Sequence, residues 1–129
     1  MKGFLTNIEK ATIKNTDYRR VLYTGKHSQL VLMSLESGEE IGEEVHGLDQ
    51  FIRFEKGSAK VILNKTDEHE VGADDAIVIP ADTLHNVINT GGEPLKLYTI
   101  YSPPEHKDGT VQATKADEFE EHFDGQTSE

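Results

Sequence analysis

The chain has 129 residues and a formal net charge of −11, and it contains no cysteine. This length is typical of a single domain with its own core, and the missing cysteines exclude disulfides, thiolate catalysis and cysteine-ligated metals, so that only nitrogen and oxygen ligands remain. The negative charge repels phosphate backbones and anionic lipid surfaces, so neither nucleic acid nor a membrane is an expected partner.

Short runs of β-branched and aromatic residues follow one another along most of the chain. Turn signals such as Ser37-Gly38 and Thr90-Gly91-Gly92 separate these runs. The pattern predicts strands over residues 20–23, 29–36, 51–54, 59–63, 76–79, 86–88 and 95–101. Many short strands at roughly ten-residue spacing are typical of an all-β sandwich or barrel.

The C-terminal part differs from the rest in charge and in pattern. Residues 105–129 hold eight acidic and two basic residues, a net charge of −6. Apolar residues at helical spacing predict a short helix over residues 114–123, with Thr114 and Asp117 as its capping pair. We therefore expect a barrel over residues 1–104, followed by an acidic tail whose last residues fray.

The chain opens without the features of a targeting segment. The first ten residues, MKGFLTNIEK, contain no apolar run, and no stretch approaches the ~20 apolar residues of a membrane span. From these two observations we expect a soluble, cytoplasmic protein.

Four polar residues have the spacing of a metal site. Side chains alternate between the two faces of a strand, so Glu44 and His46 project to the same side. If Gln50 opens the next strand after a turn, its side chain returns to that face. His85 follows a Pro-x-Asp turn at the head of another strand, where a ligand would enter from across the barrel. The four side chains would then reach one ion.

Two motifs around these residues resemble those of the cupin superfamily. The first is Glu44-x-His46, three residues, Gln50, six residues, Gly57. The second is Asp74, five residues, Pro80-x-Asp82, two residues, His85, three residues, Asn89. The resemblance covers residues 30–101, with the core motifs within residues 38–101. It implies a small single-domain cupin with a double-stranded β-helix, or jelly-roll, barrel.

The chain departs from the family pattern at the ligand positions. Glutamate replaces the first histidine of the family motif and glutamine replaces its glutamate, while aspartates stand at two glycine positions. The resemblance implies a divalent transition metal, Fe, Mn, Ni or Zn, held by Glu44, His46, Gln50 and His85. Two histidines and one carboxylate already make a facial triad, so Gln50 is either a loose ligand or a substrate contact.

Other interpretations of the polar residues stay open. Glu44 follows a run of acidic residues that is typical of a solvated surface, and, if it does not bind the metal, it is a candidate catalytic base with a pKa raised by burial. His46 and His85 are also compatible with barrel histidines that neighbouring groups satisfy. The remaining histidines are expected on the solvated surface: His27, His69, His106 and His122.

Three functions follow from the resemblance and the ligand set. The first is a metal-dependent enzyme acting on a small oxygen-rich substrate such as a sugar, uronate or keto acid, with isomerase-like Lewis-acid chemistry related to mannose-6-phosphate isomerases. The second is an iron-dependent dioxygenase, and the third is a non-catalytic barrel that binds a metabolite or a metal. The resemblance also implies a homodimer, to which Phe4, Leu5 and Ile8 would supply an exchanged strand.

Overall fold

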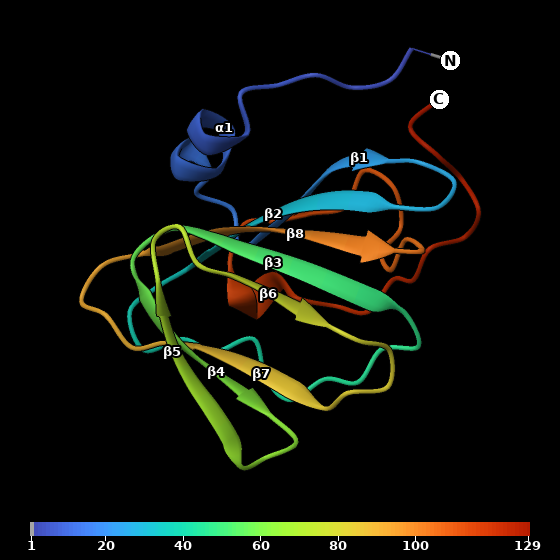
Figure 1. The fold of residues 1–129 in the computed structure, drawn as a ribbon. Helices are drawn as coiled ribbons and strands as arrows, with labels where there is room; N and C mark the ends of the chain where they lie inside the picture. Colours follow the sequence, from blue (N-terminus) through green and yellow to red (C-terminus); the bar gives the residue numbers. More distant parts are fainter. Residues whose placement is uncertain (1) are drawn as a thin grey trace.

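The computed structural model describes residues 2–129, which form two antiparallel sheets packed face to face (Figure 1). In chain order the elements are α1 (Ile8–Lys14), β1 (Arg19–Thr24), β2 (Gln29–Leu35), β3 (Asp49–Lys56), β4 (Ser58–Leu63), β5 (Asp67–Gly72), β6 (Ala76–Ile79), β7 (His85–Asn89), β8 (Leu95–Ser102), β9 (Val111–Gln112) and the 3-10 helix η1 (Lys115–Asp117).

The two sheets have different sizes and share one barrel interior. The larger has the strand order β6-β3-β8-β2-β1-β9, and the smaller has the order β5-β4-β7. A segment before β3 extends the smaller sheet, because Glu40 bridges to Ile88 and Glu44 bridges to His85 in antiparallel register. The fold class predicted from the sequence, an all-β double-stranded β-helix, is confirmed.

The core lies between the sheets and ends at the polar site. Along β3 every second residue is buried, so Gln50, Ile52 and Phe54 face the same interior. Ile52 and Phe54 are fully buried and belong to one hydrophobic core with Met33, Leu35 and Val87. Gln50 therefore heads a row of apolar side chains and is the polar member of that row.

Two elements, strand β5 and helix α1, were not predicted from the sequence. Strand β5 has the sequence DEHEVG and lies at a sheet edge, where most of its side chains are exposed, so no apolar alternation marks it. Helix α1 is seven residues long and buries only Thr12 completely. Its start is fixed by Asn7, whose side chain accepts a hydrogen bond from the backbone of Lys10 at 3.1 Å. Ile8, expected in an exchanged strand, begins this helix.

The helix predicted over residues 114–123 is wrong in length. The capping pair is present, because the Asp117 carboxylate accepts hydrogen bonds from the backbone and hydroxyl of Thr114, but only η1 forms. Beyond it the backbone pairs in the manner of a strand. Phe123 N donates to Glu105 O at 2.9 Å, so it is not available for an intrahelical bond. Neither α1 nor η1, the helices of residues 2–129, has the length and apolar character to cross a membrane.

The chain end is also more ordered than the sequence predicts. Ser128 N donates to Thr24 O at 2.9 Å, and Thr24 N donates to the Ser128 hydroxyl at 2.8 Å. Glu129 accepts hydrogen bonds from the backbone of Lys2 and from the hydroxyl of Tyr23. The acidic tail is therefore joined to the end of β1, and it lies against the barrel instead of fraying.

Candidate metal centre

Backbone pairing places the first two candidate ligands side by side. Glu44 N donates to His85 O at 2.9 Å, and His85 N donates to Glu44 O at 3.0 Å. His85 is thus a direct neighbour of Glu44 on the smaller sheet. The expectation from the sequence, that His85 enters from across the barrel, is wrong. His46 lies two residues beyond Glu44, so its side chain returns to the same face.

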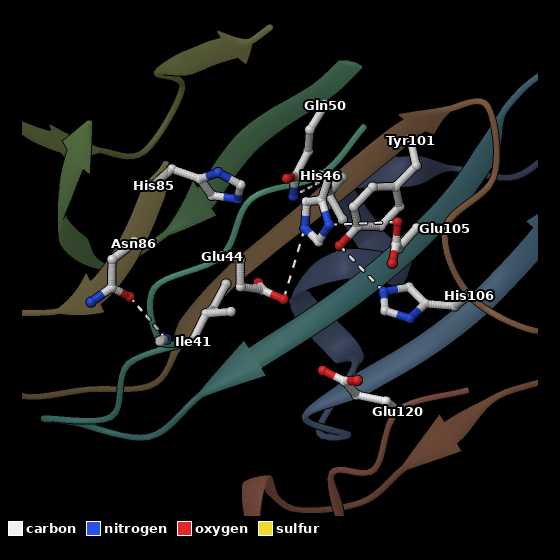
Figure 2. Close-up of polar contacts among 12 residues, drawn as sticks. Ile41, Glu44, His46, Gln50, His85, Asn86, Tyr101, Glu105, His106 and Glu120 are labelled. Carbon is white, nitrogen blue, oxygen red and sulfur yellow. Dashed lines mark hydrogen bonds and ion pairs between the residues drawn. The ribbon is translucent and has the colours of Figure 1, made fainter. Parts of the chain in front are cut away.

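Three of the predicted ligands converge on one point. Glu44, His46 and His85 each offer one ligand atom, and these three atoms all lie within 4.8 Å of one another. Nε2 of His46 is 3.8 Å from a carboxylate oxygen of Glu44, and the two imidazole rings have centroids 5.3 Å apart. Figure 2 shows Gln50 on β3 with its side chain beside the His46 ring. The structure therefore brings together all four residues singled out from the sequence.

Buried atoms without partners mark the same place. Within residues 2–129, Nε2 of His46, Nε2 of His85 and Oε1 of Gln50 are buried and accept no hydrogen bond. The nitrogen of the Gln50 amide donates to the Thr99 hydroxyl at 3.1 Å, so Oε1 is its free end. A buried acceptor without a partner costs about 1–3 kcal/mol. Three of them in one location fit a shared cation, which would satisfy all three at once.

The ring of His85 is oriented for this role. Its Nδ1 lies 2.9 Å from the backbone oxygen of Thr83, which can only accept a hydrogen bond. Nδ1 therefore carries the proton, and Nε2 keeps its lone pair for a metal ion. Metal-binding histidines are commonly held in this way by an outer acceptor.

Burial shifts the protonation of the other two ligands in opposite directions. Removal from water raises the pKa of Glu44 to about 7, although the positive charge of Arg19 opposes the shift. Burial, assisted by the neighbouring His85, lowers the pKa of His46 to about 4. At pH 7, His46 is neutral and Glu44 is partly ionised. Metal ligands must be a neutral imidazole and an ionised carboxylate, so of Glu44 and His46 it is Glu44 that has a proton to lose near neutral pH.

A pocket of about 410 Å³ opens over Glu44 and His46. Its lining carries more negative than positive groups: Glu43, Glu44, Glu105, Glu118, Glu120 and Glu121 against one guanidinium, that of Arg19. Arg19 is itself buried and donates to Gln112 at 2.8 Å and to Glu118 at 3.0 Å. The pocket therefore presents an acidic wall, most of it from the C-terminal segment.

The sequence did not identify the groups that this segment adds to the site. His106 was expected on the surface, but it packs edge-on against the fully buried Tyr101, with ring centroids 5.1 Å apart. Burial lowers the pKa of His106 to about 3. Its sequence neighbours are polar, and its burial arises because the chain turns back over the barrel mouth after β8. The surface prediction for His106 is wrong, whereas His27, His69 and His122 are exposed as expected.

Comparison with known proteins places the chain among cupins. Residues 31–101 match the cupin domain. Uncharacterized protein YrkC of Bacillus subtilis (strain 168) is 53% identical over 122 residues, which are 90% of this chain and 66% of that protein. This chain thus spans just under two thirds of the length of that relative. An uncharacterized protein of Acanthamoeba polyphaga mimivirus is 45% identical over 116 residues, 87% of this chain and 72% of its own.

Solved structures agree with this placement. The crystal structure of BH2720 from Bacillus halodurans has a TM-score of 0.88 and 51% identity, and it covers 90% of this chain and 92% of its own. A cupin family protein with a double-stranded β-helix fold from Methanocaldococcus jannaschii has a TM-score of 0.63 and 17% identity, over 68% of this chain and 81% of its own. At that identity the second likeness shows the fold alone.

Proposed function

The chain belongs to the cupin family, and from the geometry of its pocket we propose that it is a metal-dependent enzyme acting on a small, uncharged, oxygen-rich molecule such as a sugar. A divalent transition-metal ion would be held by Glu44, His46 and His85, with Oε1 of Gln50 as a fourth donor. The observation that carries this proposal is the convergence of three unpartnered buried acceptors beside one carboxylate. Two imidazoles and a carboxylate suit Fe, Mn, Ni or Zn.

The metal, when bound, would supply Lewis acidity toward a carbonyl or hydroxyl oxygen of the substrate. The protein supplies the surroundings of that oxygen. Tyr101 and His106 form an aromatic wall next to His46, and Nε2 of His106 lies 3.4 Å from the Tyr101 hydroxyl. A volume of about 410 Å³ is within the usual range for small-molecule pockets. These features support a site for one small ligand.

The charge of the pocket narrows the substrate class. The sequence left sugars, uronates and keto acids open, together with the sugar phosphates of mannose-6-phosphate isomerases. A wall with several carboxylates repels anions, and the one guanidinium is already paired with Glu118. Neutral aldoses and ketoses fit this potential better than carboxylates or phosphates do.

A panel of hexose derivatives that carry different charges at C6 tests this function. We would load the protein separately with Fe²⁺, Mn²⁺, Ni²⁺ and Zn²⁺ and follow glucose, glucuronate and glucose 6-phosphate by NMR. We expect glucose, the neutral sugar, to be converted with a higher kcat/KM than glucuronate or glucose 6-phosphate. Replacing Glu120 and Glu121 together by glutamine should reduce this preference, whereas the same change at Glu68 and Glu70 on exposed β5 should not.

Two outcomes would contradict the proposal. Failure to convert any aldose, ketose or uronate with any of the four metals would remove the isomerase-like activity. Oxygen consumption by the iron-loaded protein with diketones or flavonoids would instead favour the dioxygenase that the two-histidine, one-carboxylate set also permits.

Metal binding is expected to release a proton from Glu44, and the number released should depend on pH. A carboxyl with a pKa of about 7 holds roughly 0.9 proton at pH 6 and roughly 0.1 at pH 8. Because metal and proton compete for this carboxylate, metal affinity should fall as the pH drops below 7. Calorimetric titration with Zn²⁺ in buffers of different ionisation enthalpy measures the count. An equal count at pH 6 and pH 8 would mean that Glu44 does not bind the metal and would leave it as the candidate base.

A further inference from the structure

The two histidines of the candidate metal centre are arranged alike, although different groups hold them. His85 has Nε2 free toward the site and Nδ1 against the Thr83 backbone oxygen at 2.9 Å. His46 also has Nε2 free toward the site, but its Nδ1 faces a carboxylate oxygen of Glu105 at 3.5 Å. Figure 2 shows Glu105 on the side of the His46 ring away from His85. Glu105 therefore offers an oxygen to Nδ1 of His46, as Thr83 does to Nδ1 of His85.

The contact between Glu105 and His46 is shielded from water. The side chain of Glu105 is 13% exposed and that of His46 is 9% exposed. A carboxylate this close to a ring nitrogen in a shielded site favours a proton on that nitrogen. In His46 a proton on Nδ1 leaves the lone pair on Nε2, which is the atom that faces Glu44 at 3.8 Å.

The C-terminal segment and the side chain of Gln29 on β2 together hold Glu105 in place. Its second carboxylate oxygen lies 3.1 Å from Nδ1 of the exposed His122. Its backbone oxygen accepts from Phe123 N at 2.9 Å, and Lys107 N donates to Glu121 O at 3.2 Å. Its backbone nitrogen donates to the Gln29 side chain at 3.3 Å. The two carboxylate oxygens thus serve different histidines, one inside the site and one at the surface.

From this geometry we propose that Glu105 is a positioning residue of the metal centre, which fixes the Nδ1–H form of His46 and is itself held by His122. The inference rests on the proposed metal-binding function and extends it beyond the four ligands. It also gives the acidic C-terminal segment a role, because Glu105 and His122 lie outside residues 31–101, which match the cupin domain. Loss of such an outer partner typically lowers metal affinity 10–100-fold.

The tautomer of His46 tests the proposal directly. In metal-free protein labelled with ¹⁵N-histidine, long-range ¹⁵N–¹H spectra report which ring nitrogen carries the proton. We expect Nδ1–H for His46 in the wild type. In Glu105→Gln the carboxamide can donate its N–H to Nδ1, so the proton should move to Nε2. The backbone amide spectrum shows whether the variant is folded.

Affinity for the metal alone gives the second readout. Glu105→Gln should weaken Zn²⁺ and Mn²⁺ binding 10–100-fold, and His122→Ala should weaken it by less, since it removes only the outer support. Glu70→Gln is the matched control, because Glu70 is an exposed carboxylate on β5 and does not line the pocket over Glu44 and His46. This variant should change neither the tautomer nor the affinity.

The outcomes separate this inference from the proposed function. A wild-type His46 with the proton on Nε2, or an unchanged tautomer and affinity in Glu105→Gln, would overturn the role of Glu105. Because the tautomer is measured without metal, it reports on Glu105 even if the wild type binds no metal. A wild type that binds no metal would contradict the proposed function, but the positioning of His46 by Glu105 would still hold.

Discussion

Replacing His85 by alanine is expected to lower the affinity for Zn²⁺ or Mn²⁺ more than a hundredfold. A direct ligand should exceed the 10–100-fold effect of an outer-shell partner, because its loss removes a coordinating atom and opens the site to water. The Nε2 atom of His85 is one of the three unpartnered acceptors, and its ring is already oriented by Thr83. A hundredfold loss corresponds to about 2.7 kcal/mol of binding free energy.

Thermal unfolding measures this effect through linkage. A metal present at 100 times its Kd stabilises the wild type by about 2.7 kcal/mol, or roughly 10 °C in a domain of this size. At the same metal concentration this increment should fall below about 0.4 kcal/mol in His85→Ala. His69→Ala is the control, because His69 is an exposed histidine on β5 beside Asp67 and should leave the increment unchanged. An equal increment in His85→Ala would show that the ion binds elsewhere. Metal-free Tm values recorded with a chelator separate any cost of the mutation to the fold itself.

The spacing of residues was sufficient to predict that the four candidate ligands lie together. Glu44 and His46 share a face because strand side chains alternate, and the motif fixed the positions of Gln50 and His85. The direct pairing of Glu44 with His85 was not predictable in this way, since it depends on the register between two distant segments. Local pattern gives the face of a side chain but not its neighbour on the next strand.

The outer part of the site was not predictable from the sequence. Glu105 and His106 sit among polar residues, a composition that is typical of solvated chain. Their burial depends on the chain crossing the barrel mouth and pairing with residues 121–123. The tail was therefore predicted to be an acidic end whose last residues fray, whereas it forms one wall of the pocket. Contacts of this kind form between segments that are distant in the sequence, so they produce no periodic pattern of apolar residues from which burial could be predicted.

The aspartates that depart from the cupin glycine pattern have a backbone explanation. Asp74 and Asp82 stand at two motif positions occupied by glycine in the family, and both have positive φ, 74° and 68°. Aspartate adopts the left-handed region more readily than most residues, so it can replace glycine there without changing the turn. Asp74 also accepts a hydrogen bond from Arg53 at 3.1 Å. These two departures therefore leave the fold unchanged, in contrast to the ligand substitutions, which alter the chemistry.

Gly57 ends the first motif, and replacing it even by alanine is expected to destabilise the fold. It joins β3 to β4 with a φ of 100°, and a Cβ atom there would lie 3.2 Å from the Leu95 Cα and 3.3 Å from the Pro94 carbonyl oxygen. Both are backbone atoms, and Leu95 is fully buried at the start of β8, so neither can rotate away. Gly57→Ala combines backbone strain with overpacking, each worth about 1–3 kcal/mol. We expect it to lower the free energy of unfolding by roughly 3 kcal/mol.

Gly109 separates the two contributions to this loss. Its φ of 79° is also positive, but a Cβ atom there would meet nothing within 4 Å among residues 2–129. Gly109→Ala should therefore lose only the strain, about 1 kcal/mol. Urea unfolding of the metal-free proteins measures both values without interference from the site. If the two variants lose the same stability, the approach of β8 to Gly57 contributes nothing, and backbone conformation alone explains the glycine in the motif. A larger loss in Gly57→Ala instead means that this motif position is reserved for glycine by the contact of the β3–β4 turn with the buried start of β8.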